Sequence, residues 1–533
     1  MLTTLMDELA PVEISRDSAV PLHRQLFLQL RERILAGALP LGTRLPASRR
    51  FAEQLGVSRN TVITAIEQLT AEGLVAARVG ASTVVTGHVA IAYGATSNVR
   101  VASAPTRQSL ATSNVKSTAE SSRSTDPEVV VEGLIERSAD DAAAVGHTMA
   151  ISARGLRLGR AHRALPQAVA TMQFQPGIPD IGKFPAALWG RMVSRAYRRL
   201  GDDLSGYAHA GGYMPLRAAL AGYLSASRGV RCGPAQVLVV TSAQAALDLA
   251  TRMLSDAGDR AWLEQPGYNG ACAAFEANGL DLGRVPVDAD GVRANEVAEQ
   301  FADARIGYCT PSHQFPTGAT LTMERRLELL AWATDNRAWL LEDDYDSEFR
   351  YANRPVAAMQ GLVADARVIY IGSFSKTLYP GLRVAYLVVP TVLAASFIQA
   401  MRQTGQEPSL PLQAALFDFI EGGHFGRHLR RMRNIYRTRH ATMTTALNTT
   451  LPHLGQVLEA DGGLQLSFGM HREYDDRKFS AAAQQAGFGV EPLSRYCADD
   501  SPERGLVFGF GQCPDIGLDE RIDVLARALA RVE

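Results

Sequence analysis

The chain has 533 residues, of which 46% are hydrophobic and 20% are charged, and its net charge is -1. A chain of this length exceeds what one hydrophobic core supports, so we expect two or more domains in an ordinary globular protein. The balanced charge excludes a polycation, and any nucleic-acid site must therefore be a local patch.

The five cysteines include no Cys-x-x-Cys pair, which argues against a disulfide framework or a metal site and fits a reducing compartment. The first residues, MLTTLMDELAPVE, lack a basic start followed by an apolar stretch, so we predict no signal peptide. No window holds the roughly eighteen apolar residues of a membrane span. These features predict a cytoplasmic protein without a metal.

The N-terminal region begins with a helical pattern, PLHRQLFLQLRERILAG, with leucines and an isoleucine four residues apart. In the next segment, Ser48 is a candidate N-cap and Gly56 ends a short helix. Ser58 caps a second helix that runs to Gly73. Two short helices joined in this way predict a helix-turn-helix, and LVAARVGASTVV predicts a two-stranded wing.

Charge in this region points to DNA. Residues 16–86 carry nine arginines, no lysine and five acidic residues. Arg49, Arg50 and Arg59 fall at helix starts, where backbone amides favour phosphate and a recognition helix enters the major groove. The alternative is a solvated charged face, but the order of helix, helix-turn-helix and wing favours DNA binding.

The middle and the remainder of the chain differ in composition. Residues 87–165 contain VASAPTRQSLATSNVKSTAESSRSTDPE, which is rich in Ser, Thr and Ala and predicts a flexible linker. From residue 166 to the end, apolar runs such as VLVVTS and VIYIGSFS alternate with helical patterns. This alternation predicts an α/β domain whose mostly parallel sheet has helices on both faces.

One lysine is in an unusual setting. The chain has only four lysines, and Lys376 follows Ser-Phe-Ser between two apolar runs in VIYIGSFSKTLYPGLRVAYL. A lysine on such a rigid, partly desolvated support suits a Schiff base with an aldehyde cofactor. Ser373 and Arg383 flank it and are candidate phosphate ligands. Lys183 lacks such neighbours, and an ordinary surface lysine is the alternative reading for Lys376.

Further candidates fall where strands are expected to end. Asp343, Asp344 and Tyr345 follow the apolar run WLLE, and a carboxylate there could hold a pyridine nitrogen protonated. In VLVVTSAQAALDL, a helix starting near Ala243 offers free amides to phosphate. In EQPGYNGA, Tyr268 could stack on a ring, although a packing role is equally open.

The motifs of the two halves resemble two different protein families. The segment LPASRRFAEQLGVSRNTVITAIEQL resembles the GntR-type winged helix, and the series YAHAGGYMPLR, TSAQAAL, EQPGY, PSHQFPTG, EDDYDSEF and SFSKTLYPGLR resembles the fold-type I aminotransferases. The first resemblance implies DNA contacts from Arg49, Ser58, Arg59, Thr61 and, in the wing, Gly80. The second implies a domain over residues 166–533 with a small C-terminal α+β subdomain and pyridoxal 5'-phosphate (PLP) as the cofactor.

The aminotransferase resemblance also implies a role for each site residue. Lys376 would form the Schiff base, Asp343 would pair with the pyridine nitrogen, Tyr345 would face the ring oxygen and Tyr268 would stack. The implied phosphate ligands are Ser242, Ala243, Gln244, Ser373, Arg383 and, from the neighbouring subunit, Tyr207.

The sequence departs from the aminotransferases at two places. Phe315 takes the place of an Asn that usually touches the ring oxygen, and His313 or Gln314 may substitute for it. Val507 takes the place of the Arg that usually holds the substrate carboxylate, with Arg504 just upstream. If that Arg is absent, ordinary amino-acid turnover is not expected.

Together the two halves resemble the MocR/GabR-type regulators. That resemblance implies a transcription regulator, not an enzyme, whose effector domain senses PLP, an amine or an amino acid and changes operator binding. It also implies a head-to-tail homodimer on double-stranded DNA. Two alternatives stay open: an active aminotransferase tethered to DNA, and a GntR-type regulator with a PLP-free dimerisation scaffold.

Overall fold

We describe the fold from a computed structural model of the chain. The structure describes residues 12, 14–15, 22–35, 38–40, 42–71, 74–77, 83–85, 152, 154–155, 172–206, 209–351, 357–458, 460–498 and 501–532. The predicted linker, 87–165, lies almost entirely outside these residues, as do Gly80 and Tyr207.

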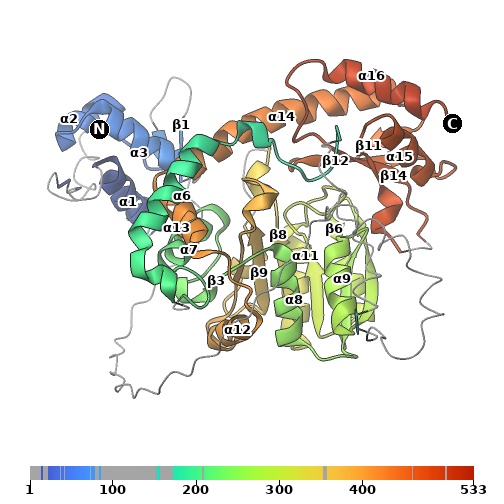
Figure 1. The fold of residues 1–533 in the computed structure, drawn as a ribbon, viewed down its shortest axis with the longest axis horizontal. Coiled ribbons are helices and arrows are strands. Elements are labelled where there is room, and N and C mark those ends of the chain that lie inside the picture. Colours follow the sequence, from blue (N-terminus) through green and yellow to red (C-terminus); the bar gives the residue numbers. More distant parts are fainter. Residues whose placement is uncertain are drawn as a thin grey trace, which may run out of the picture. The chain divides into compact units, whose positions relative to one another are not determined.

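The N-terminal region is a winged helix-turn-helix (Figure 1). Its elements are α1 (Leu22–Leu35), α2 (Ser48–Leu55), α3 (Arg59–Ala71), β1 (Val75–Ala77) and β2 (Thr83–Val85), with the two strands antiparallel. Val62, Ala65 and Leu69 on α3 recur at helical spacing and are buried in the core of this domain. Gly56 ends α2 in the left-handed conformation, as predicted.

One helix boundary differs from the prediction. Ala47, not Ser48, is the N-cap of α2, and no side chain caps that end of the helix. Ser48 is instead the first helical residue, and its hydroxyl accepts a bond from Arg59 Nε at 3.4 Å. The prediction was wrong by one residue because the choice between two adjacent caps depends on this contact with the next helix.

The large domain contains an eight-stranded sheet with neighbours in the order β3-β10-β9-β8-β7-β4-β5-β6 (Figure 1). The strands from β9 to β5 are parallel, while β10 is antiparallel to both of its neighbours, so β3 and β9 run in the same direction. The strand bounds are β3 (Val237–Val240), β4 (Arg260–Gln265), β5 (Asp281–Asp288), β6 (Gly291–Val292), β7 (Ile306–Cys309), β8 (Trp339–Asp344), β9 (Val368–Ser373) and β10 (Ala385–Val388).

Helices cover both faces of this sheet, because alternate residues of its strands enter different cores. Leu238 and Val240 pack with residues of α8, α9 and α12, whereas Val237 and Val239 pack with residues of α6, α7 and α13. The helices are α6 (Ala186–Leu200), α7 (Met214–Arg228), α8 (Ala243–Leu254), α9 (Asn269–Asn278), α10 (Ala294–Gln300), α11 (Met323–Asp335), α12 (Thr391–Thr404) and α13 (Leu410–Glu421). A mostly parallel sheet between helices confirms the predicted fold class.

The C-terminal subdomain is α+β. Its antiparallel sheet has the order β11-β12-β14-β13 and is joined to the large domain by the long helix α14 (His424–Thr450). The other elements are β11 (Gly455–Val457), β12 (Gln465–Met470), α15 (Asp476–Gln485), β13 (Glu491–Pro492), β14 (Gly505–Gly509) and α16 (Leu518–Leu529). Within the described part of the chain, no helix is long and apolar enough to span a membrane.

Candidate functional site

The start of α3, like that of α2, exposes residues to solvent. Ser58 caps this helix as predicted, since its Oγ accepts from Thr61 N at 3.1 Å and lies 2.9 Å from Thr61 Oγ1. Arg49 and Arg59 are exposed, while the opposite face of α3 is buried. Of the predicted DNA-contacting residues that the structure describes, Arg49 lies in the first turn of α2, and Ser58, Arg59 and Thr61 lie at the start of α3. The free amides and guanidinium groups of these two helix starts suit phosphate.

The candidate cofactor residues gather at one edge of the large sheet. β3, β4, β7, β8 and β9 run in the same direction, so the segments that follow them lie side by side. These segments and strand ends carry Ser242, Tyr268, His313, Asp343, Tyr345, Ser373 and Lys376. Distant parts of the sequence are thus brought to the place where open α/β sheets bind ligands.

Lys376 lies in the loop after β9, half-buried. Its Nζ donates to the carbonyl oxygen of Gly177 at 2.6 Å. Gly177 has φ of 72°, and a Cβ atom there would lie only 2.6 Å from the Lys376 Nζ, so the close approach requires glycine. The amide of Gln465 is nearby and buried, and its Nε2 has no hydrogen-bond partner among the described residues.

Asp343 is buried at the end of β8. Tyr308 donates its hydroxyl to Asp343 Oδ2 at 2.9 Å, whereas Oδ1 has no partner among the described residues. Burial raises the pKa of this carboxyl to about 7. A buried carboxylate oxygen without a donor costs free energy, and a protonated pyridine nitrogen would supply that donor. The residue therefore fits the role that the resemblance implies for it.

Asp344 has a different environment on the other face of the sheet. Its Oδ2 accepts from Arg228 Nε at 2.7 Å and from the Tyr370 hydroxyl at 2.5 Å. Because successive side chains of a strand alternate, Asp343 and Asp344 cannot both face the Lys376 side. The sequence alone could not choose between the two carboxylates on physical grounds, and the ion pair with Arg228 occupies Asp344.

The N-terminus of α8 provides a candidate phosphate seat. Ser242 caps the helix by accepting from Ala245 N at 3.1 Å, and Ala243 begins it. Gln244 donates to the Gly270 carbonyl at 2.8 Å, and its buried Oε1 has no partner among the described residues. The free amides of this helix start, together with Ser373 at the end of β9, suit a phosphate. Arg383 is exposed two residues before β10, whose Ala385 pairs with Ser373.

Aromatic rings surround this region. Phe315 makes edge-on contacts with Tyr268, Tyr345 and Tyr496, with ring centroids 5.7, 6.0 and 5.0 Å apart. Phe315 thus fills a hydrophobic position beside the site and has no polar group with which to replace the missing Asn.

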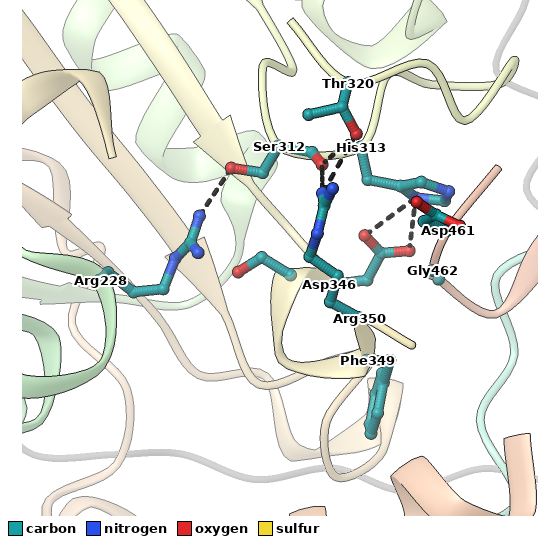
Figure 2. A pocket seen from close by; sticks show the side chains of 11 residues that line it. Arg228, Ser312, His313, Thr320, Asp346, Phe349, Arg350, Asp461 and Gly462 are labelled. Carbon is teal, nitrogen blue, oxygen red and sulfur yellow. Dashed lines mark hydrogen bonds and ion pairs between the residues drawn. The ribbon is translucent and has the colours of Figure 1, made fainter. Parts of the chain in front are cut away.

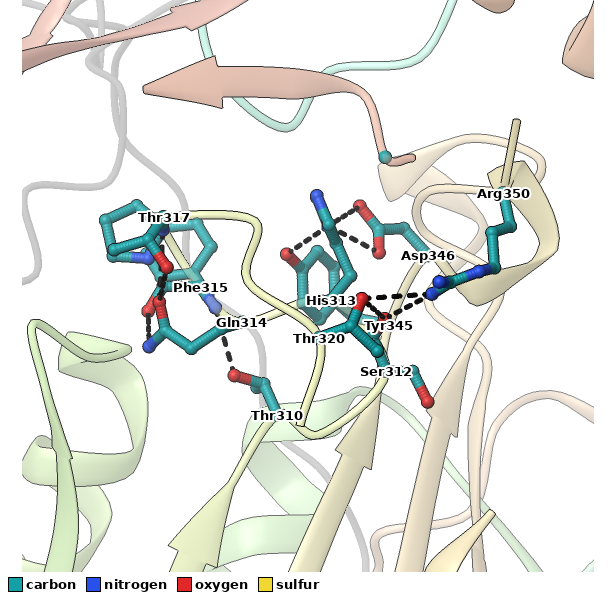
Figure 3. Close-up of polar contacts among 12 residues, drawn as sticks. Thr310, Ser312, His313, Gln314, Phe315, Thr317, Thr320, Tyr345, Asp346 and Arg350 are labelled. Atoms are coloured by element: carbon teal, nitrogen blue, oxygen red, sulfur yellow. Dashed lines mark hydrogen bonds and ion pairs between the residues drawn. The ribbon is translucent and has the colours of Figure 1, made fainter. Parts of the chain in front are cut away.

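The two residues before Phe315 differ in what they can reach (Figure 3). The amide of Gln314 is held by its own loop: it accepts from Thr317 N at 3.0 Å and donates to the Pro266 carbonyl at 2.8 Å. His313 instead places Nδ1 3.0 Å from the Tyr345 hydroxyl and 3.1 Å from Asp346. Of the two candidate substitutes, only His313 touches a predicted ring-oxygen ligand.

A small cavity lies behind His313 (Figure 2). It is lined in part by Arg228, Ser312, Asp346 and Arg350. Arg350 closes one side by donating from NH1 to the Ser312 carbonyl at 3.2 Å and to Thr320 Oγ1 at 3.1 Å. Several polar side chains of this region are therefore held by one another, while Asp461, which also lines the cavity, is exposed.

The position of the expected carboxylate-binding Arg contains no cation. Val507 is fully buried on β14 and pairs with Ser467 on β12. Arg504 is held by its own loop through NH1, which donates to the carbonyls of Ser501 and Glu503, both at 2.8 Å.

Sequence reasoning missed three residues of this site. Tyr308 was hidden within an apolar strand, and Arg228 lies at the end of a helix far from any recognised motif. Asp346 was visible in EDDYDSEF, where five acids among eight residues were a signal that more than one carboxylate points inward. Their partners, Asp343, Asp344 and His313, become apparent only when the strands are assembled.

Comparisons with known proteins agree with this geometry. Residues 22–85 match the family described as bacterial regulatory proteins, gntR family, and residues 186–496 match aminotransferase class I and II. The chain is 40% identical over 522 residues to the probable rhizopine catabolism regulatory protein MocR of Rhizobium meliloti, covering 98% of this chain and 96% of that protein. This chain belongs to the MocR-type family of GntR regulators.

Other relatives support the same assignment. The pyridoxine biosynthesis transcriptional regulator PdxR of Corynebacterium glutamicum is 28% identical over 94% of both chains. Among solved structures, the α-aminoadipate aminotransferase LysN of Thermus thermophilus, complexed with N-(5'-phosphopyridoxyl)-L-leucine, is 26% identical, with a TM-score of 0.64 over 73% of this chain and 98% of that one. The chain is therefore a GntR-type transcription regulator whose large domain has the fold of PLP-dependent aminotransferases.

Proposed function

We propose that this MocR-type regulator binds PLP through Lys376 and that PLP, or an amine or amino acid acting on it, changes the affinity of the winged helix for its operator. The observation that carries this proposal is the buried Asp343: its Oδ1 has no partner among the described residues, and Lys376 is close enough to lower the pKa of this carboxyl against the larger effect of burial. A scaffold without cofactor would gain nothing from such an arrangement.

The described residues divide the work of holding PLP. Lys376 would supply the amine, Asp343 would pair with the pyridine nitrogen, Tyr345 and His313 would lie toward the ring oxygen, and Tyr268 would flank the ring. The phosphate contacts fall to Ser242, Ala243, Gln244, Ser373 and Arg383. When bound, PLP supplies an electrophilic aldehyde that exchanges between amines.

Regulation needs two states that the effector distinguishes, because a ligand shifts an equilibrium only by its differential affinity. We propose a homodimer, arranged head-to-tail and completed by Tyr207 of the neighbouring subunit, in which this shift alters the spacing of two winged helices. A dimer with two winged helices requires two half-sites in the operator. Arg49, Ser58, Arg59, Thr61 and Gly80 would make the DNA contacts.

The test of cofactor binding is chemical. Borohydride treatment of the PLP-loaded protein, followed by peptide mapping, should find the adduct on Lys376, with loss of visible absorbance in Lys376→Ala. Lys478→Ala is the matched control, because Lys478 lies at the start of α15 and outside the site. A protein that binds no PLP, or that carries the adduct on another lysine, would refute the proposal.

A working aminotransferase is the second candidate, favoured by the fold. Val507 opposes it, since no cation occupies that position to hold a substrate carboxylate. Keto-acid formation over many turnovers, measured with a panel of amino acids, separates the two. We expect no more than one equivalent of product per subunit.

A further inference from the structure

His313, Asp346 and Tyr345 are in contact with one another, and the cofactor assignment gives no role to Asp346. His313 and Asp346 have side-chain exposures of 5% and 1%, and His313 Nδ1 lies 3.1 Å from both oxygens of Asp346. The Tyr345 hydroxyl lies 3.0 Å from the same nitrogen. One imidazole nitrogen thus faces a carboxylate and a phenol at once (Figure 3).

The contacts of Nδ1 do not by themselves fix the imidazole tautomer, and we assign its protons with Asp346 as a hydrogen-bond acceptor. An ionised carboxylate only accepts, so Nδ1 must carry the hydrogen that lies between it and Asp346. A protonated Nδ1 cannot also accept from Tyr345. The Tyr345 hydroxyl therefore has to direct its own proton away from the imidazole.

The remaining surroundings keep that hydroxyl a donor. Burial, and then Asp346 and Asp343, raises the pKa of Tyr345 well above its usual value, with Glu264 and Asp344 acting in the same direction. From α14, His440 interacts electrostatically with His313, and its pKa is lowered by burial first and then by His313, while Asp461 acts in the opposite direction. No described protein group other than His313 lies within hydrogen-bonding distance of the Tyr345 hydroxyl.

A glycine of the C-terminal subdomain lies close against His313 and Asp346. Gly463 has φ of 80°, and a Cβ atom there would overlap the His313 ring and lie 2.8 Å from Asp346 Oδ2. The glycine lets the chain close over both side chains, which leaves little freedom for the imidazole to rotate. This steric contact limits the movement of the imidazole, while the choice of the nitrogen that faces Asp346 rests on the hydrogen bonds.

We propose that Asp346 and His313 are positioning residues that aim the Tyr345 hydroxyl proton into the cofactor site, in place of the direct side-chain contact that Phe315 cannot make. The inference rests on the proposed binding of PLP at Lys376. A donor aimed at the ring oxygen stabilises its ionised form and lowers the pH at which the bound cofactor loses its proton.

The test is a double-mutant cycle on the PLP-loaded protein, read as the pH midpoint of its visible absorbance change. Asp346→Asn replaces an acceptor-only carboxylate by an amide that can also donate, so it no longer holds the proton on Nδ1 and should raise the midpoint by about one unit, a tenfold change in proton affinity, as should Tyr345→Phe. The double variant should match Tyr345→Phe within error. If Asp346 acted only as a nearby negative charge, its removal would lower the midpoint, which is the opposite sign.

Two further variants keep the test decisive. His313→Gln should raise the midpoint as Asp346→Asn does, and it replaces that variant if the latter does not fold. Asp461→Asn, an exposed acid that lines the neighbouring cavity, should leave the midpoint unchanged. Additive effects of Asp346→Asn and Tyr345→Phe would overturn the inference alone, whereas a wild-type protein without bound PLP would overturn the proposed function with it.

Discussion

Charged groups are used in opposite ways by the winged helix and by the edge of the large sheet. Arg49, Arg50 and Arg59 are exposed to solvent. At the sheet edge, Asp343 and Glu264 are buried, and burial raises the pKa of each to about 7. Exposed charges act through long-range, salt-screened attraction, whereas buried charges act through specific partners. The two regions should therefore respond to different perturbations.

The largest effect that would sharpen this contrast is expected for Asp343→Asn. An amide in place of the carboxylate removes a charge-assisted hydrogen bond to the pyridine nitrogen, so PLP affinity should fall by about 10- to 100-fold. Equilibrium titration of the visible absorbance measures this loss. DNA affinity of the cofactor-free protein should stay the same, and a parallel loss of DNA binding would break the separation of the two regions.

A smaller effect is expected for Arg59→Ala in the winged helix. The loss of an exposed guanidinium should weaken DNA binding by about 1–3 kcal/mol and, if it contacts phosphate, reduce the salt slope by about one. Fluorescence anisotropy at several salt concentrations gives both values. Arg527→Ala, which removes an exposed arginine from α16, is the matched control and should change neither. Unchanged DNA binding by Arg59→Ala would contradict the assigned reading surface.

The buried carboxyls predict a pH dependence of the cofactor-free protein. The folded-state pKa of Asp343 is raised to about 7, so its contribution to stability is present below its unfolded value near 3.8 and is lost as the pH rises through 7. Glu264, Glu342 and Glu348, whose pKa values are also raised to about 7, act in the same sense. Free energies of unfolding should fall across this window.

The contribution of Asp343 to this pH dependence can be measured separately from those of the three glutamates. Asp343→Asn should make the fall shallower by up to about 1.4 kcal/mol per pH unit, the value for one proton. Urea denaturation of the apoprotein between about pH 4.5 and 7 measures it. An identical slope in the variant would show that Asp343 does not hold its proton in the folded state.

The smallest expected effect concerns the start of α3. Ser58→Ala removes the cap on Thr61 N and should destabilise the winged helix by about 1 kcal/mol. Thermal unfolding of the full chain, monitored at low salt, reports this change. Ser58→Asp, which preserves a capping oxygen but adds negative charge, should keep the stability and weaken DNA binding, and a loss of both would mean that the cap and the contact cannot be separated.

The sequence predicted features that depend on short local motifs and missed contacts between residues far apart in the chain. The helix start at Ala243, the cap at Ser58 and the loop position of Lys376 follow from short motifs in the sequence. The contacts of Tyr308 with Asp343 and of Asp346 with His313 join residues more than thirty positions apart. No periodicity or spacing in the chain encodes such pairs, because they depend on which strands become neighbours.

The central claim is that PLP bound at Lys376 changes the affinity of the winged helix for DNA. The most direct measurement is the affinity for a DNA fragment selected by this protein from a random pool, with and without PLP, for the wild type and for Lys376→Ala. The account predicts that PLP changes the affinity of the wild type and leaves that of the variant unchanged. Equal affinities for the wild type in both conditions, with PLP shown spectroscopically to be bound, would contradict it.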